Sequence, residues 1–147
     1  MIKKHKQAVL FDFNRTIFNP DTNELYPYAR EILSLLYQKY DLYLVSKIEL
    51  DRLEKLKKLG INNFFAETYF IKKKTEELFE EILGGYDKKK SYVVGDLVEN
   101  EISIGIKIKT NTIWLRQGKF KDIKLPISHE QPTHTIQDIR EIENIIV

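Results

Sequence analysis

The sequence predicts an α/β protein in which a central, mostly parallel β-sheet is covered by helices on both faces, a three-layer, Rossmann-like sandwich. Short apolar runs alternate with amphipathic segments of about ten residues, which is the pattern of repeated βαβ units. The first run, residues 8–11, contains no polar residue, as expected for a strand that is buried on both faces. No linker or internal repeat interrupts this pattern, so we expect one domain over residues 1–147.

Strands and helices are expected to alternate along the chain. The apolar runs predict strands over residues 8–11, 42–45, 64–71, 92–94, 112–115 and 135–136. Helices are expected over residues 28–40, 49–59, 75–83, 99–106 and 138–146. Turn-forming residues indicate a loop or small hairpin over residues 18–27 and a longer loop over residues 117–133.

Two of the helix ends have clear local signals. Gly60 follows the expected helix 49–59, and glycine is the residue that most often ends a helix. Thr75 precedes the expected helix 75–83, where its hydroxyl can accept a hydrogen bond from a free backbone N–H group.

The composition is that of a globular protein without cysteine chemistry. Hydrophobic residues make up 42% of the chain and charged residues 31%, and the absence of cysteine excludes disulfides and thiolate catalysis. The net charge of +2 is too small to indicate a nucleic-acid partner. No apolar stretch approaches the roughly 20 residues that span a bilayer, and the basic N-terminus has no apolar signal-peptide region. We therefore expect a cytoplasmic protein without a membrane or nucleic-acid partner.

Three of the expected strands are followed by a polar residue that can carry chemistry. Asp12, Ser46 and Asp96 each stand at the end of an apolar run. Because the carboxyl ends of parallel strands meet at one edge of a sheet, these side chains are expected to converge. Two neighbouring carboxylates repel each other unless a cation lies between them, and Mg²⁺ prefers carboxylates together with substrate phosphate. With a lysine from the run 72–74, this set predicts phosphoryl transfer through Asp12.

In this order the residues resemble the motifs of the haloacid-dehalogenase-like (HAD) superfamily of aspartyl-nucleophile hydrolases. The first motif of that family, D-x-D-x-T after an apolar strand, corresponds to residues 12–16, Asp-Phe-Asn-Arg-Thr. A strand ending in serine, a lysine ahead of a helix, and G-D-x-x-x-x-D at residues 95–101 (with glutamate in place of the last aspartate) follow in the family order. The short connections after the first two strands resemble the capless class. Open sites of that class admit macromolecular substrates or are covered by a neighbouring subunit, so a homo-oligomer is one expectation.

The resemblance implies a nucleophile and a Mg²⁺ site. Asp12 would attack phosphorus, form an aspartyl phosphate that water later hydrolyses, and also bind the metal. The backbone carbonyl of Asn14 and the carboxylate of Asp96 would be further ligands. Glu101, in place of the usual aspartate, would reach the metal through water. The alternative for Glu101 is that it only stabilises a helix N-terminus electrostatically.

The resemblance also implies which residues bind the phosphoryl group. Ser46 and Lys47 would contact it, while Thr16 would steady the loop after the first strand and lie near the phosphate. Lys73 is our choice for the family's lysine, and the other lysines of the run 72–74 stay open as alternatives.

Asn14 is the main departure from the family pattern. In the family's phosphatases an aspartate at this position protonates the leaving group and then activates water, and an amide does neither at neutral pH. General acid–base catalysis contributes typically about 10²–10⁴-fold. We therefore predict a slow Mg²⁺-dependent phosphatase acting on a phosphorylated small molecule or macromolecule. The alternative is a non-catalytic or regulatory relative that keeps the phosphate and metal site; a response-regulator-like receiver fits less well, because Asp12 has no adjacent acid.

Overall fold

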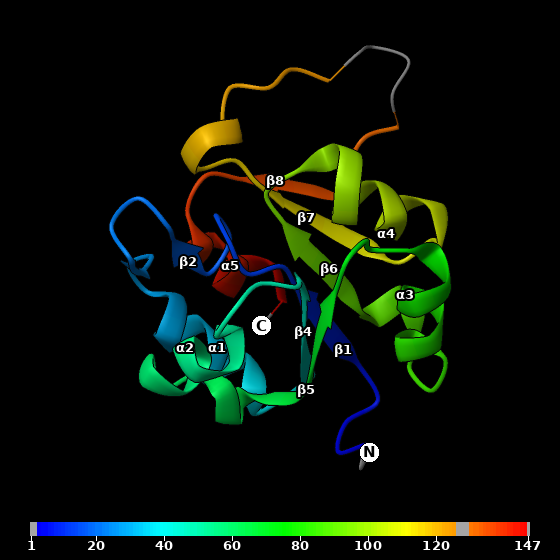
Figure 1. Ribbon diagram of the computed structural model, residues 1–147. Helices are drawn as coiled ribbons and strands as arrows, with labels where there is room; N and C mark the ends of the chain where they lie inside the picture. Colours follow the sequence, from blue (N-terminus) through cyan, green and yellow to red (C-terminus); the bar gives the residue numbers. More distant parts are fainter. Residues whose placement is uncertain (1–2, 126–129, 147) are drawn as a thin grey trace.

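Six parallel strands form the centre of the computed structural model, which describes residues 3–125 and 130–146. Their order is β5-β4-β1-β6-β7-β8 (Figure 1). The bounds are β1 Ala8–Phe11, β4 Asp41–Lys47, β5 Phe65–Ile71, β6 Tyr92–Gly95, β7 Asn111–Leu115 and β8 His134–Ile136. Strand β1 pairs with β4 on one side and with β6 on the other, so the strand order reverses there. Open α/β sheets bind ligands outside the carboxyl ends of the strands at such a point.

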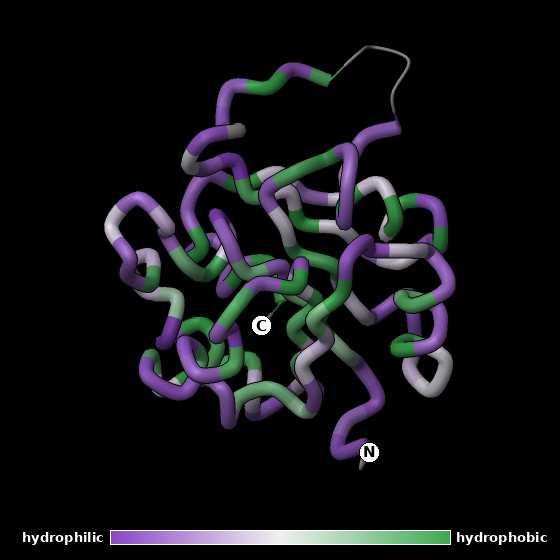
Figure 2. The backbone as a smooth tube through the Cα atoms, viewed as in Figure 1, coloured by the Kyte–Doolittle hydropathy of each residue, from purple (hydrophilic) through white to green (hydrophobic). Residues whose placement is uncertain are grey.

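Helices cover both faces of this sheet, as Figure 1 shows. One face carries α1 (Ala29–Tyr37), α2 (Arg52–Lys58) and α5 (Ile142–Ile146), and the other carries α3 (Glu76–Leu83) and α4 (Ser103–Lys107). Successive residues of β1 point to opposite faces: Val9 joins the core beneath the first group of helices, and Leu10 joins the core beneath the second. Figure 2 shows the hydrophobic residues concentrated in the central strands and the hydrophilic ones on the outer helices and loops. The predicted three-layer α/β sandwich is confirmed.

The small hairpin expected between residues 18 and 27 consists of β2 (Phe18–Asn19) and β3 (Glu24–Leu25), which pair antiparallel. It is the segment inserted between β1 and α1. Only residues 48–51 separate β4 from α2. In the described part of the chain there is accordingly no separate cap domain. Short 3₁₀ turns, η1 (Asn62–Phe64), η2 (Lys88–Lys90) and η4 (Gly118–Phe120), complete the connections.

Two expected helices differ from the continuous elements that the sequence predicts. The helix expected over residues 99–106 begins as a π-helical turn, η3 (Val98–Ile102), in which Asn100 has non-helical backbone angles, and continues as α4. The wide turn places the buried side chain of Glu101 over the end of β6. The closing helix is divided into a 3₁₀ turn, η5 (Ile139–Glu141), and α5, with Asp138 forming a capping box at the start.

Close packing between α4 and β7 predicts a stability effect at Gly105. A Cβ atom built there would lie 2.5 Å from Cγ2 of Thr112, which is itself fully buried. We expect Gly105→Ala to lower the free energy of unfolding by about 1–3 kcal/mol, the usual cost of overpacking a core. Urea denaturation measures the effect, and Gly84→Ala, whose new Cβ would meet atoms no closer than 3.4 Å, is the matched control. A Gly105→Ala protein as stable as the control would contradict this packing.

Among the described residues, every helix is too short or too polar to cross a lipid bilayer.

Candidate functional site

Three carboxylates meet at the carboxyl edge of the sheet. Asp12 directly follows β1, Asp96 directly follows β6, and Glu101 lies in η3; one oxygen of each lies within 4.8 Å of the others. The backbone N–H of Asp12 donates to the carbonyl of Val94 at 3.1 Å, which extends the pairing of β1 with β6 as far as Asp12. Asp96 and Glu101 are buried, whereas the side chain of Asp12 is 13% exposed and opens to solvent. The structure therefore brings together three of the side chains that the sequence predicted.

Lys74 is the lysine that joins this cluster. Its Nζ donates to Asp12 Oδ1 at 2.7 Å and to Glu101 Oε1 at 2.9 Å, and its side chain is 5% exposed. Lys73, our choice from the sequence, is exposed and does not join the cluster, whereas the alternative Lys74 does. Thr75 caps α3 by accepting from the backbone N–H of Leu78 at 3.2 Å, as predicted. Lys74 directly precedes this cap residue, at the one position of the lysine run whose side chain is buried in the cluster.

Three ionised carboxylates would carry more negative charge than Lys74 neutralises. Burial, reinforced by the charge of Asp12, raises the pKa of Asp96 to about 8. Burial likewise raises the pKa of Glu101, with Asp12 adding to the effect. Burial alone would lower the pKa of Lys74, but attraction to Asp12 and Glu101 outweighs it and raises this pKa to about 12. A cation among the carboxylates would relieve this surplus of negative charge.

Glu101 Oε2 supplies a direct test of whether a cation fits. This oxygen is buried and has no hydrogen-bond partner among the described residues, although buried polar atoms are normally paired. Together with the oxygens of Asp12 and Asp96 it belongs to a set of hard ligands of the kind that Mg²⁺ prefers. The residues present therefore fit a divalent cation, held by Asp12 and Asp96 directly and by Glu101 directly or through water.

This charge distribution predicts how stability depends on pH. The pKa of Asp96 lies near 3.8 in an unfolded chain and about 8 in the fold, so the folded protein binds a proton more tightly. The stability that this proton contributes is complete below pH 4 and is lost as the pH rises to about 8. A divalent cation at this site would favour the deprotonated carboxylates, so the stabilising effect of added Mg²⁺ should grow over the same range.

Thermal unfolding across this range, with EDTA or with Mg²⁺, measures both effects. Asp96→Asn is the reference, because its amide does not titrate. Without metal, the unfolding temperature of the wild type relative to Asp96→Asn should fall as the pH rises. Added Mg²⁺ should restore it. A difference that is independent of both pH and Mg²⁺ would contradict the proposed cation site.

A hollow of about 370 Å³ lies next to the carboxylates. Ser46, at the end of β4, is buried with its Oγ 3.4 Å from the carbonyl oxygen of Lys47, and the side chain of Lys47 is exposed. The hollow is lined by Asp12, Asn14, Arg15, Ser46, Lys47, Lys74, Asp96, Leu97, Asn100 and Glu101. Ser46, Lys47 and Lys74 thus line a space beside the expected nucleophile.

Thr16 lies outside this hollow, so its placement does not support a phosphate contact. It is fully buried, and its Oγ1 has no hydrogen-bond partner among the described residues. Its backbone holds the loop instead: the N–H donates to the carbonyl of Phe13 at 3.2 Å, and the carbonyl accepts from Nε2 of Gln117 at 3.1 Å. Nothing in the sequence pointed to Gln117, which comes from the segment after β7.

Arg52 was also missed. It begins α2, it is 5% exposed, and its Nη1 lies 3.4 Å from Oδ1 of Asn14. The sequence gives no signal for it, since a lone arginine in an amphipathic helix is normally a surface residue. The contact exists because the short link after β4 brings the start of α2 beside the loop that follows β1.

Gly95 gives Glu101 its position. A Cβ atom at Gly95 would lie 2.2 Å from Cγ of Glu101, so any larger residue would displace that side chain from Lys74. We expect Gly95→Ala to weaken Mg²⁺ binding by roughly 10–100-fold, the usual effect of disturbing the support of a metal site. Calorimetric titration with Mg²⁺ measures this, with Gly84→Ala as the control. Unchanged affinity would show that Glu101 takes no part in binding the cation.

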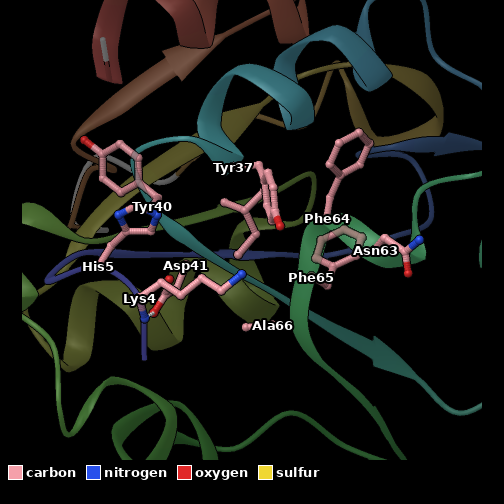
Figure 3. A pocket seen from close by; sticks show the side chains of 10 residues that line it. Lys4, His5, Tyr37, Tyr40, Asp41, Asn63, Phe64, Phe65 and Ala66 are labelled. Carbon is pink, nitrogen blue, oxygen red and sulfur yellow. Dashed lines mark hydrogen bonds between the residues drawn. The ribbon is translucent and has the colours of Figure 1, made fainter. Parts of the chain in front are cut away.

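A second hollow, of about 310 Å³, is lined by residues that include the first residues of β4 and β5, at the amino end of these strands (Figure 3). Aromatic side chains, among them Tyr37 and Phe64, line it together with Lys4. Its carboxylate, Asp41, is the first residue of β4 and accepts hydrogen bonds from the backbone N–H of Lys4 at 3.0 Å and from Tyr86 Oη at 2.7 Å. The acidic cluster lies at the other end of the strands, so this hollow is separate from it.

Comparisons with known proteins agree with this arrangement. Residues 70–142 match the model of a family described as HAD-hydrolase-like. A search of curated proteins found no match.

Solved structures share the fold over nearly the whole chain. The HAD-hydrolase YfnB of Bacillus subtilis, bound to magnesium, is 16% identical with a TM-score of 0.80, and the match covers 97% of this chain and 99% of that one. A 2-haloacid dehalogenase of Pseudomonas syringae is 14% identical with a TM-score of 0.76, covering 99% and 98%. The core domain of a protein described as a phosphoglycolate phosphatase, from Streptococcus pneumoniae, is 19% identical with a TM-score of 0.69, covering 97% and 96%.

Proposed function

Since the chain has the haloacid-dehalogenase-like fold and its residues 70–142 match the HAD-like hydrolase family, we propose that it is a Mg²⁺-dependent phosphatase. Asp12 is the nucleophile, and the reaction passes through an aspartyl phosphate. The observation that carries this proposal is the cluster of Asp12, Asp96 and Glu101 around Lys74, with one buried carboxylate oxygen left without a partner.

The chain's own residues supply most of this reaction. A carboxylate oxygen of Asp12 attacks phosphorus, and the bond from phosphorus to the leaving-group oxygen breaks. Water then attacks the same phosphorus, releases phosphate and restores the Asp12 carboxylate. Lys74 holds Asp12 in place through Oδ1 and offsets the charge of the incoming phosphoryl group. When bound, Mg²⁺ would reduce the repulsion between that group and the carboxylates.

Ser46, Lys47 and Asn14 contribute from the other side of the hollow. The hydroxyl of Ser46 and the ammonium of Lys47 bind phosphoryl oxygens in this proposal. The backbone carbonyl of Asn14 would help to hold the metal, whereas its side-chain amide moves no proton.

Phosphate release from 4-nitrophenyl phosphate and acetyl phosphate, with Mg²⁺ or with EDTA, tests the proposal. We expect slow turnover that requires Mg²⁺. An independent probe is beryllofluoride, which mimics a phosphoryl group on an aspartate and is followed by ¹⁹F NMR. No turnover over a broad phosphate panel, together with no beryllofluoride adduct in Mg²⁺-loaded protein, would refute the phosphatase proposal.

The second candidate function is a non-catalytic or regulatory protein that binds phosphate and metal, and Asn14 is the observation that favours it. Binding of Mg²⁺ and inorganic phosphate without turnover would support this alternative. Turnover at ordinary enzyme rates would exclude it.

The open site suggests the size of the partner. Residues 48–53, directly after Lys47, expose three large apolar side chains, of which Leu50 is 89% and Ile48 is 55% exposed. In our proposal a macromolecular substrate or a second copy of the chain covers this edge. Light scattering shows whether the chain self-associates, and Leu50→Ser should weaken either contact without altering hydrolysis of acetyl phosphate.

A further inference from the structure

Arg52 occupies an unusual position for a charged residue. Its side chain is 4% exposed, and its guanidinium carbon lies 4.7 Å from the ring centroid of Phe13. That ring is itself held by stacking on Phe18, with centroids 5.0 Å apart. Nη2 pairs with Glu49, whereas Nη1 is directed to Asn14. The guanidinium is thus fixed on three sides, next to the loop that carries the nucleophile.

The contact with Arg52 determines which way the amide of Asn14 faces. A guanidinium has only donors, so the Asn14 atom 3.4 Å from Nη1 must be the carbonyl oxygen Oδ1. The amino group, Nδ2, is then on the other branch of the planar amide. Asn14 lines the hollow beside Asp12. Among the described residues, its side chain forms a hydrogen bond only with Arg52, which leaves Nδ2 without an acceptor there. A donor is therefore left for a ligand in the hollow.

We propose that Arg52 is a positioning residue that holds Asn14 as a hydrogen-bond donor to the phosphoryl or leaving-group oxygen of the substrate. This inference rests on the proposed function of Asp12. It also names a substrate class. Asn14 donates a hydrogen bond without giving up a proton. When the bond from phosphorus to the leaving-group oxygen breaks, its electron pair therefore stays on that oxygen, and the group departs as an anion. Acyl phosphates and phosphates of acidic phenols are substrates of this kind; simple alkyl phosphates are not.

A leaving-group series tests the substrate class. Rates are measured with acetyl phosphate, with substituted phenyl phosphates of graded acidity, and with an alkyl phosphate. For the wild-type protein kcat/KM should fall steeply as the leaving group becomes more basic. A flat dependence would overturn the proposed class, since it would mean that a protein group protonates the leaving oxygen.

A double-mutant cycle tests the role of Arg52. Arg52→Met and Asn14→Ala should each lower kcat/KM for acetyl phosphate by about tenfold, the effect of losing one oriented hydrogen bond. The double variant should be no slower than Asn14→Ala, because Arg52 acts through that residue. Arg52→Lys should recover part of the loss. Arg140→Met, at an exposed arginine in η5, is the control.

The outcomes separate this proposal from the proposed function. Turnover with additive effects of the two variants would overturn the role of Arg52 and leave Asp12 as nucleophile. The absence of both turnover and a beryllofluoride adduct would overturn both proposals. Should Arg52→Met fail to fold, NMR of the wild-type Asn14 side-chain amide replaces it: its protons should shift when beryllofluoride and Mg²⁺ are added. Side-chain amide protons that do not respond in a protein that forms the adduct would also overturn the proposal.

Discussion

Asp12→Asn is expected to abolish Mg²⁺-dependent phosphate release, with a loss of about 10⁴-fold or more, as when the nucleophile of a covalent mechanism is removed. The substitution keeps the size and shape of the side chain but replaces the attacking oxygen with an amide that forms no aspartyl phosphate. Steady-state hydrolysis of acetyl phosphate measures the loss, and ¹⁹F NMR should show no beryllofluoride adduct. Asp21→Asn, at an exposed aspartate in the β2–β3 hairpin, is the matched control.

The fold should survive this substitution. Lys74 keeps Glu101 as a partner at 2.9 Å, and the change removes one of the negative charges that raise the pKa values of Asp96 and Glu101. We therefore expect the metal-free variant to unfold at a temperature near that of the wild type, so that lost activity is not lost structure. A folded Asp12→Asn protein that keeps more than about a tenth of wild-type activity would exclude Asp12 as nucleophile.

The fold was predictable because local patterns and topology agree. The apolar runs that end at Asp12, Ser46 and Asp96 are strands β1, β4 and β6, which are neighbours in the sheet. The predicted parallel pairing makes their carboxyl ends converge, so the proximity of Asp12 and Asp96 followed from it without knowledge of the strand order.

The remaining site residues depend on contacts that no periodicity encodes. Three consecutive lysines have the same chemistry, and only the path of the chain from β5 into the Thr75 cap decides that Lys74 is buried. The π-helical turn that positions Glu101 differs from an ordinary helix by a single wide turn, which residue propensities do not specify. Arg52 and Gln117 reach the first loop from distant elements, so their roles follow from tertiary packing.

Asn14→Asp is expected to raise kcat, by up to about 10²–10⁴-fold, since it restores a group that can transfer protons at the position where the family's phosphatases have one. The gain should depend on the leaving group. Alkyl phosphates need a proton on the departing oxygen and should gain more than acetyl phosphate. For acetyl phosphate the aspartate can assist only the attack of water on the aspartyl phosphate. Steady-state rates with both substrates, under saturating Mg²⁺, measure the difference.

Arg52 sets a limit on this gain. Its Nη1 lies 3.4 Å from Oδ1 of Asn14, so a carboxylate at that position would pair with the guanidinium and favour the ionised form. An ionised aspartate activates water but protonates a leaving group poorly, so the gain for alkyl phosphates should increase further when Arg52→Met is added. Asn100→Asp places the same charge in the same hollow, away from the first motif, and should not reproduce the effect. An unchanged rate in Asn14→Asp would show that a step other than proton transfer limits the reaction.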